Sequence, residues 1–256
     1  MRTITLVTDF GDFYPGVMKG VILKLAQNVN IVDITHNIES QNVFQGAFIL
    51  YHAFHFFGKN SIHLAIVDPG VGGFRKAIAI KTRNYIFISP DNGISYPSAS
   101  KDGIEEVFEI DRSISDLVGE RSKTFHGRDI FAPAAAMAAK SKFEKYFTPI
   151  TKIKKLDLFK INFYKSKIKC RVAYIDKFGN LITNLRKEYI KGVKAFYLND
   201  VKFPYVGKYS DVRIGEPLAL VGSFNTLELS VREGDAAKLL GIKSGDRDIT
   251  LEVEYE

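Results

Sequence analysis

The sequence predicts an α/β protein: an N-terminal, Rossmann-like domain with a parallel sheet, followed by a smaller, barrel-like C-terminal domain of antiparallel strands. In the first half, strand and helix patterns alternate, which is typical of a parallel sheet with helices on its faces. In the second half, Gly, Asn, Asp and Pro separate short alternating runs, which favours an antiparallel sheet or small barrel. We therefore expect an α/β domain over residues 1–150, a lysine-rich linker over 151–167 and a β domain over 168–256.

The first elements follow from the spacing of apolar residues. Thr3–Thr8 is an apolar run of strand length, and Pro15–Gln27 has helical spacing, with a proline suited to its first turn. Asn30–Thr35 predicts a second strand. A helix capped by Ser40 is expected to run to about Phe57, before a third strand over Ser61–Asp68.

The later elements are shorter. Ala77–Lys81 and Tyr85–Ser89 predict a pair of strands around a turn, and Arg128–Ala139 predicts another helix. The strands of the β domain are expected in KIKCRVAYID, GNLITNL, KAFYLN, VKFPYV, PLALVGS, TLELSV and ITLEVEYE.

Composition limits the class of protein. The chain has 256 residues, of which 46% are hydrophobic and 25% charged, so it can bury a core and is neither disordered nor fibrous. Its apolar runs are too short for a membrane helix, and its first residues lack the apolar core of a signal peptide. The single cysteine, Cys170, cannot form an internal disulfide. We therefore expect a cytoplasmic protein that is not bound to a membrane.

Positive charge is concentrated in one segment. The formal net charge is +7, and ten lysines and two acids give residues 140–169 a charge of +8. Lysines and apolar residues are mixed there, which is typical of a solvated connector whose lysine stems cover apolar surface. A strip that binds RNA or phosphate is the alternative. Because nucleic-acid binders usually spread their charge over a face or groove, we expect no nucleic-acid partner.

Acidic residues follow the first three predicted strands. Asp9, Asp33 and Asp68 come at the carboxyl ends of these strands, the edge at which open α/β sheets bind ligands. A carboxylate there can accept both hydroxyls of a ribose, although each Asp could instead cap a turn or helix. The first loop lacks G-x-G-x-x-G, which disfavours a dinucleotide site.

Two other loops carry groups suited to chemistry. In Asp68–Arg75, Pro and Gly allow a sharp turn between an acid and an arginine, which could form a structural pair or hold a nucleophile or phosphate. His126 lies beside a glycine in a loop before a predicted helix, where an imidazole that titrates near neutral pH can reach a ligand. The chain has no H-E-x-x-H motif and no cysteine cluster, so we expect no catalytic metal.

Polar residues of the β domain have two readings as well. Asn180, which follows Asp176 and Phe178, has an amide that can donate to and accept from an adenine edge, or it belongs to a hairpin turn. Ser223 and Glu228 are equally open between ligand contact and solvent exposure.

Seven segments together point to one family. They are TDFG at 8–11, VDITH at 32–36, VDPGVGG at 67–73, SPDNG at 89–93, TFHGRDIFAPAAA at 124–136, FGNLITN at 178–184 and GSFNTLELSV at 222–231. With these segments the chain resembles the S-adenosyl-L-methionine hydroxide adenosyltransferases, which are related to fluorinase and chlorinase. The match extends almost to the C-terminus, and VDPGVGG together with FHGRD-x-F-x-P makes it specific.

The resemblance implies a reaction and an assembly. S-adenosyl-L-methionine and water would give adenosine and L-methionine without a cofactor. The family forms homotrimers whose active sites lie between the N-terminal domain of one subunit and the C-terminal domain of its neighbour. Asp68, Arg75 and His126 would be the catalytic set, with either Asp68 or His126 taking the proton of the water.

The resemblance also implies a substrate-binding set. Asp9 would hold the ribose hydroxyls, and Asp12 and Tyr14 would contact the methionine end. The other implied contacts are Asp176 with the methionine ammonium, Asn180 with adenine, Ser223 and Glu228 in the pocket, Val231 through its backbone, and Phe125 and Phe178 against flat or apolar surfaces. The chain has no Trp, whereas the halogenating relatives place one near the ribose.

Three rival functions remain. Halide transfer to the same carbon is the nearest, but the carboxylate of Asp68 would repel a halide. A non-catalytic protein that binds adenosine or RNA would use the lysine-rich segment. Methyl transfer from the same substrate is disfavoured because the first loop lacks the glycines common in Rossmann-type methyltransferases.

Overall fold

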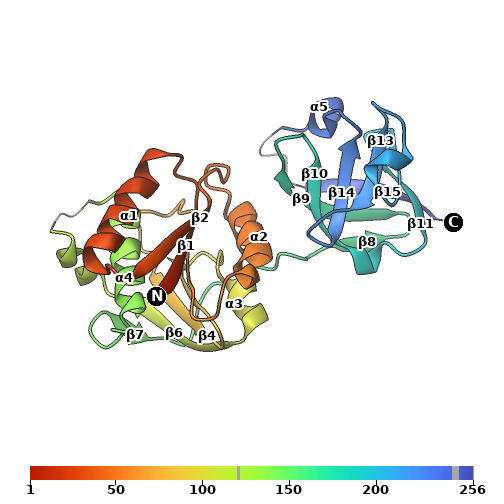
Figure 1. Cartoon of the computed structure of the whole chain (residues 1–256). Helices are drawn as coiled ribbons and strands as arrows, with labels where there is room; N and C mark the ends of the chain where they lie inside the picture. The colour runs from red at the N-terminus through yellow and green to blue at the C-terminus, as the bar shows by residue number, and fades with distance from the viewer. Residues whose placement is uncertain (120–121, 244–247, 256) are drawn as a thin grey trace. The chain divides into compact units, whose positions relative to one another are not determined.

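Strands and helices alternate in the first part of the chain and strands predominate in the second, which confirms the predicted fold class (Figure 1). The computed structural model describes residues 1–119, 122–243 and 248–255. The chain divides into two units, which we call unit 1 (Met1–Leu156) and unit 2 (Asp157–Glu256).

Unit 1 is built on a mixed sheet. Its elements are β1 (Arg2–Thr8), α1 (Phe13–Leu25), β2 (Val29–Thr35), α2 (Val43–Ala53), η1 (Phe54–Phe56), β3 (Ile62–Ile66), β4 (Ala77–Thr82), β5 (Ile86–Pro90), α3 (Tyr96–Asp102), β6 (Ile104–Ile110), η2 (Arg112–Leu117), η3 (Gly127–Phe131), α4 (Ala132–Ala139) and β7 (Phe147–Pro149). The strand order is β2-β1-β3-β5-β4-β6-β7. Strands β2, β1, β3 and β5 are parallel, and β4 lies antiparallel between β5 and β6. The carboxyl ends of β1 and β3 are therefore neighbours at one edge of the sheet.

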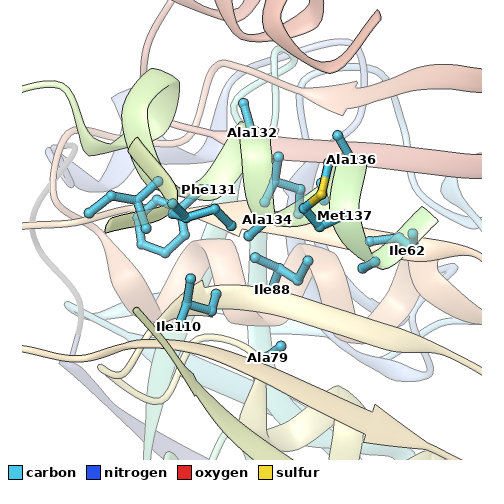
Figure 2. Close-up of a cluster of buried hydrophobic side chains, with 14 of the residues drawn as sticks. Ile62, Ala79, Ile88, Ile110, Phe131, Ala132, Ala134, Ala136 and Met137 are labelled. Carbon is cyan, nitrogen blue, oxygen red and sulfur yellow. The ribbon is translucent and has the colours of Figure 1, made fainter. Parts of the chain in front are cut away.

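Helices cover both faces of this sheet. Helices α1 and α4 pack together on one face, and α2 and α3 pack together on the other (Figure 1). Figure 2 shows Ala136 and Met137 of α4 in the same cluster as Ile62 and Ile88 of the sheet. Because α4 consists mainly of buried alanines, its backbone can lie close to the strands. This packing fixes the segment immediately before α4.

Three helices differ from the predictions at their ends. Helix α1 covers Phe13–Leu25, whereas Pro15–Gln27 was expected. Helix α2 begins at Val43, and its cap is Asn42, not Ser40, because the Asn42 side chain accepts a hydrogen bond from the Gln45 backbone N–H at 3.0 Å. It ends at Ala53 and continues only as the short 3-10 turn η1. The helix predicted over 128–139 starts with a π-helical turn, η3, before α4.

Unit 2 is an antiparallel, barrel-like sheet. Its elements are β8 (Asn162–Tyr164), β9 (Lys167–Ile175), β10 (Leu181–Arg186), η4 (Lys187–Tyr189), β11 (Val193–Leu198), β12 (Val201–Pro204), η5 (Tyr209–Asp211), β13 (Pro217–Val221), β14 (Thr226–Val231), α5 (Ala236–Leu240) and β15 (Asp248–Tyr255). The order is β12-β11-β15-β9-β10-β14-β13, with β8 beside β9. A bridge between Tyr205 and Ala219 brings the two ends of this order together, so the sheet is nearly closed. Strand β8 occupies part of the segment 151–167 that we predicted as a linker.

Candidate active site

A cavity of about 290 Å³ lies at the carboxyl ends of β1 and β3 in unit 1. Asp9 follows β1, Asp68 follows β3, and His126 immediately precedes η3. All three line the cavity, as do Tyr14 and Phe125. The fold of unit 1 thus brings together predicted site residues from segments that are far apart in the sequence.

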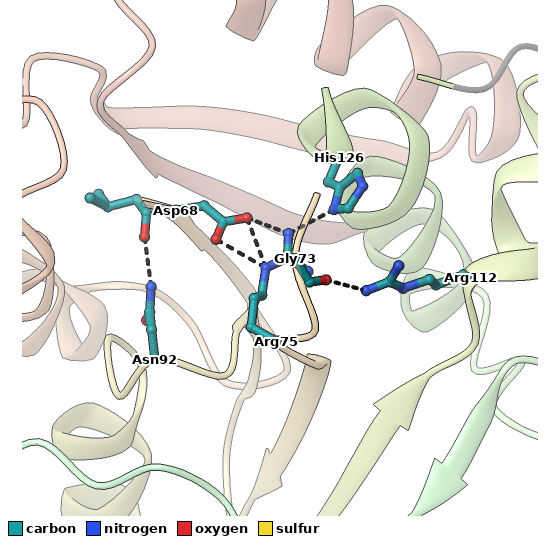
Figure 3. Close-up of polar contacts among 7 residues, drawn as sticks. Asp68, Gly73, Arg75, Asn92, Arg112 and His126 are labelled. Atoms are coloured by element: carbon teal, nitrogen blue, oxygen red, sulfur yellow. Dashed lines mark hydrogen bonds and ion pairs between the residues drawn. The ribbon is translucent and has the colours of Figure 1, made fainter. Parts of the chain in front are cut away.

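Asp68, Arg75 and His126 form a continuous polar set (Figure 3). Arg75 Nε donates to both carboxylate oxygens of Asp68, at 3.0 and 2.9 Å, and Arg75 Nη2 also donates to Asp68 Oδ2. The same Nη2 lies 2.8 Å from Nδ1 of His126. The side chains of Asp68 and Arg75 are 5% and 8% exposed, so little solvent screens their attraction. The guanidinium also lies 5.2 Å from the centre of the Phe131 ring, which helps to hold its position.

His126 is neutral in this arrangement. A guanidinium can only donate hydrogen bonds, so Nδ1 of His126 must accept and Nε2 carries the proton. Burial lowers the pKa of His126, and the positive charges of Arg75 and Arg112 lower it further. The carboxylates of Asp68 and Asp129 act in the opposite direction but do not reverse the shift. His126 therefore orients Arg75 without adding a second positive charge.

One nitrogen of Arg75 is left without a protein partner in the described structure. Arg75 Nη1 is buried and has no hydrogen-bond partner among the residues that the structure describes. A buried guanidinium N–H without a partner is costly, so buried polar atoms of this kind usually meet a ligand or water. A group that carries or develops negative charge would satisfy this donor best.

Glycines shape the loop between Asp68 and Arg75. Gly72 has a φ of +79°, and a Cβ atom on it would lie 2.8 Å from the carbonyl oxygen of Lys123. Any side chain at Gly72 would therefore push the loop between Asp68 and Arg75 away from the segment that carries His126. This confirms that the glycines of VDPGVGG allow a sharp turn with a close approach of two backbones.

Aromatic rings form one wall of the cavity. The Phe125 ring lies 4.9 Å from Tyr14 and 6.0 Å from Phe10 between centroids, in edge-to-face contacts. Gly127 makes room for them, because a Cβ there would lie 2.9 Å from Phe10 and 3.0 Å from Phe125. Phe10 lines the cavity although we did not single it out in the sequence. Its position next to Asp9 in the sequence could have indicated that it lies at the same site.

The Asp9 carboxylate is held by the loop between β2 and α2, about thirty residues further along the chain. Its Oδ2 accepts a hydrogen bond from the Gln41 backbone N–H at 2.9 Å, and Gln41 also lines the cavity. Burial raises the pKa of Asp9, the Gln41 bond offsets part of this rise, and the charge of Asp68 adds to it.

Asp33, predicted at the same edge, and Asp12, expected from the family resemblance, are not among the residues that line this cavity. Asp33 lies within β2 and pairs with Lys19 at 2.6 Å and with His36 at 3.1 Å. Partial burial raises the pKa of Asp33, but the hydrogen bonds from Lys19 and His36 together lower it below its usual value. These contacts tie β2 to α1 and to the residue that follows β2. Asp12 immediately precedes α1, makes no side-chain capping bond, and is not among the cavity-lining residues.

In unit 2, Asp176 and Asn180 lie in the turn between β9 and β10. The Asp176 carboxylate accepts from the backbone N–H groups of Phe178 and Asn180, at 2.8 and 3.0 Å. It also accepts from the Asn180 side-chain amide at 3.0 Å. These hydrogen bonds hold the turn, and the ring of Phe178 is exposed.

Glu228 is the buried carboxylate of unit 2. It accepts from the hydroxyl of Tyr209 and from Ser230 Oγ, the latter at 2.9 Å. Burial and the bond to Glu228 raise the pKa of Tyr209 to about 12, so this hydroxyl stays protonated and donates. The sequence analysis did not identify Tyr209 as a partner of Glu228. Ser223 lies in the loop before β14, and Val231 is buried in the core at the end of that strand.

Within the described part of the chain, no group of three or more His, Cys, Asp or Glu side chains is arranged to hold a metal ion. No helix among the described residues is long and apolar enough to cross a membrane.

An α/β unit with a buried carboxylate, guanidinium and imidazole at the carboxyl ends of parallel strands defines an enzyme that acts on a small polar molecule. Family models refine this class. The model of the SAM hydroxide adenosyltransferase N-terminal domain matches residues 4–146, and that of the C-terminal domain matches residues 170–248. The chain belongs to the SAM hydroxide adenosyltransferase family, which confirms the resemblance found in the sequence.

Relatives of known name agree with this family. A protein of Methanocaldococcus jannaschii named (R)-S-adenosyl-L-methionine hydrolase is 33% identical, covering 93% of this chain and 92% of the relative. A protein of the same name from Thermus thermophilus is 31% identical over 96% of this chain and 98% of its own. A fluorinase of Actinopolyspora mzabensis is 24% identical over 94% of both chains. The crystal structure of an uncharacterized conserved protein from Thermotoga maritima, 34% identical, superposes with a TM-score of 0.85 over 97% of this chain and 99% of that one.

Proposed function

We propose that this protein hydrolyses S-adenosyl-L-methionine to adenosine and L-methionine by attack of water on the ribose C5′ carbon. The observation that carries the proposal is the buried Asp68–Arg75–His126 set, of which Asp68 and His126 line the same cavity as Asp9. Family membership and the names of the relatives support the same activity.

The reaction defines what the protein must supply. A C5′–O bond forms while the C5′–S bond breaks, its electron pair leaves with the sulfur of methionine, and one proton of the water is released. The positively charged sulfonium makes methionine a good leaving group. Water is a poor nucleophile because its pKa is about 15.7. The enzyme must therefore stabilise hydroxide-like charge and hold it about 3–3.5 Å behind C5′.

The charged set suits this task. Arg75 Nη1 can donate to the oxygen on which negative charge develops. Asp68 can orient the water and receive its proton, which passes on to solvent. His126 holds Arg75 through its Nδ1, and this bond leaves that nitrogen unable to take the proton at the same time. Asp9 would hold the ribose hydroxyls, with Tyr14 and Phe125 against the substrate.

The proposal needs no cofactor, since the sulfonium already activates the bond that breaks. It also places the protein in the cytoplasm. The single cysteine supports this. Cys170 is buried, and burial raises the pKa of its thiol to about 12, so the thiol is unreactive. A chain without a disulfide is typical of a reducing compartment.

A shared site in a homotrimer is the second part of the proposal. Asp12 would contact the methionine end from the N-terminal domain. From a neighbouring copy, the contacts would be Asp176 and Phe178 with the methionine end, Asn180 and the Val231 backbone with adenine, and Ser223 and Glu228 in the pocket wall. Mixing an Asp68→Ala chain with an Asn180→Ala chain under exchange conditions tests this. Recovery of activity in the mixture, with a trimer mass by analytical ultracentrifugation, would support sharing, and an active monomer would contradict it.

Product analysis tests the activity itself. The purified protein is incubated in ¹⁸O-water with each sulfonium epimer of S-adenosyl-L-methionine, with and without chloride. We expect methionine together with adenosine that carries ¹⁸O at C5′, at a rate independent of chloride. A 5′-chloro product would instead establish halide transfer, and S-adenosylhomocysteine would establish methyl transfer. Adenosine retained on the protein without turnover would indicate a sensor.

A further inference from the structure

Arg112 reaches the loop between Asp68 and Arg75 from a separate element. It is the first residue of η2, directly after β6. Its Nη2 donates to the carbonyl oxygen of Gly73 at 2.7 Å, as Figure 3 shows. Gly73 lies in the loop that joins Asp68 to Arg75.

This loop has few restraints of its own. Residues 69–74 are exposed, and the hydrogen bonds inside the turn run from Val71 N–H to Asp68 O at 3.2 Å and from Gly73 N–H to Gly70 O at 3.1 Å. Glycines give the backbone wide conformational freedom. Gly73 is two residues before Arg75, so a bond to its carbonyl restrains the backbone from which the guanidinium extends.

The element that carries Arg112 is firmly anchored. Asp111 accepts from the Ser113 backbone N–H at 2.8 Å and thereby caps η2. The backbone N–H of Asp111 donates to Tyr146 O at 2.8 Å, and Ile114 is fully buried. Arg112 therefore extends from a fixed point towards a loop with freedom to move.

We propose that Arg112 is a positioning residue, which latches the Gly73 carbonyl and so keeps Arg75 aligned between Asp68 and His126. Only the consequence for turnover rests on the proposed function, because the latch itself exists without substrate. The charge of Arg112 adds an independent signature. The charged groups facing His126 are Arg75 and Arg112, which lower its pKa beyond the effect of burial, and Asp68 and Asp129, which raise it.

Two variants separate the charge of Arg112 from its shape. Arg112→Met removes both the charge and the donor, whereas Arg112→Lys keeps the charge and one donor group. Arg83→Met is the matched control, because it removes an exposed arginine from the turn between β4 and β5 of the same unit. Turnover of S-adenosyl-L-methionine is measured against pH. Hydrogen exchange of the segment 67–76 and NMR titration of His126 are measured without substrate, with His126→Gln to assign the signal.

Arg112→Met should lower kcat about 10-fold and change KM less than about twofold, because the lost bond aligns the reacting groups and does not bind substrate. It should speed exchange in segment 67–76 and raise the pKa of His126, because a positive charge that lowers this pKa is lost. The acid limb of the pH profile should move up by the same amount. Arg112→Lys should retain the wild-type pKa of His126 and recover part of kcat.

Three results would overturn the inference. The first is an Arg112→Met variant with the wild-type kcat and exchange rates, and the second is an Arg83→Met variant with the same effects as Arg112→Met. The third is an Arg112→Met variant whose kcat falls while the titration of His126 and the exchange of the loop stay unchanged. A wild-type protein without turnover would instead refute the proposed function. The exchange and NMR measurements would still decide whether Arg112 holds the loop.

Discussion

Acid should destabilise unit 1 through a histidine that is remote from the site chemistry. His63 in β3 is fully buried, its Nδ1 lies 2.8 Å from Thr5 Oγ1, and its ring stacks on Phe87 at 5.1 Å. Its Nε2 has no hydrogen-bond partner within the described part of the chain. Burial lowers the pKa of His63 from 6.5 to about 3, and the charge of Asp102 opposes this only weakly.

The sign and size of the effect follow from proton linkage. Below pH 6.5 the unfolded chain binds a proton at His63 that the folded protein excludes. The stabilising contribution is therefore fully present above pH 6.5 and declines as the pH falls towards 3. Each pH unit in this window removes about 1.4 kcal/mol from the free energy of unfolding. Between about pH 7 and about pH 4.5 the loss is about 2.5 kcal/mol, a large part of an ordinary stability of about 5–15 kcal/mol.

Urea unfolding at several pH values tests this expectation. The helical circular dichroism signal reports mainly on unit 1, since helices α1 to α4 belong to it. The free energy of unfolding of His63→Gln should fall less steeply below pH 6.5 than that of the wild type, by about 1.4 kcal/mol per pH unit. His55→Gln is the comparison variant, because this ring is exposed. Partial burial and the charge of Lys101 also lower the pKa of His55, so its removal should flatten the slope, but less than the removal of His63 does. Equal slopes in His63→Gln and the wild type would refute the reasoning.

Three further substitutions test the site and the fold. Asp68→Asn should lower kcat about 1000-fold, because Arg75 loses its anionic partner. The affinity for adenosine, measured by calorimetry, should change less than about threefold. Comparable losses of kcat and of affinity would show that Asp68 does not act in the chemical step. Gly127→Ala should displace Phe10 and Phe125, which shape the cavity wall, and should therefore raise KM. It should also lower the free energy of unfolding in urea by about 1–3 kcal/mol. A wild-type KM and stability would show that the wall yields freely. Asn42→Ala should cost about 1 kcal/mol of unfolding free energy by loss of the α2 cap, and an unchanged urea midpoint would contradict that role.

The central loop of the site was predictable because its chemistry is local. Asp68 and Arg75 are separated by a proline and glycines, and such a stretch predicts a sharp turn with charged ends wherever it stands. The meeting of Asp9 with Asp68 was predictable too. Strand and helix periodicity predicted a parallel arrangement, and parallel strands end at the same edge.

Other features depended on partners that no local pattern reveals. Asp33 was expected at the end of a strand but lies within β2, where Lys19 and His36 engage it. Ser40 and Asn42 are both good caps, and the packing of α2 selected Asn42. The bond from Arg112 to Gly73 joins segments whose proximity follows only from the position of β6 in the sheet.

The sequence by itself determined the strands and helices of unit 1 as far as β5, the change from α/β to β structure, the turn between Asp68 and Arg75, and the family. Those properties reside in periodicity and in contiguous motifs. Only the tertiary structure decided that Arg75 Nη1 is buried without a partner among the described residues, and that His126 and His63 are neutral. Hydrogen bonding and desolvation depend on all the atoms around a group, and packing alone brings those atoms together from distant parts of the chain.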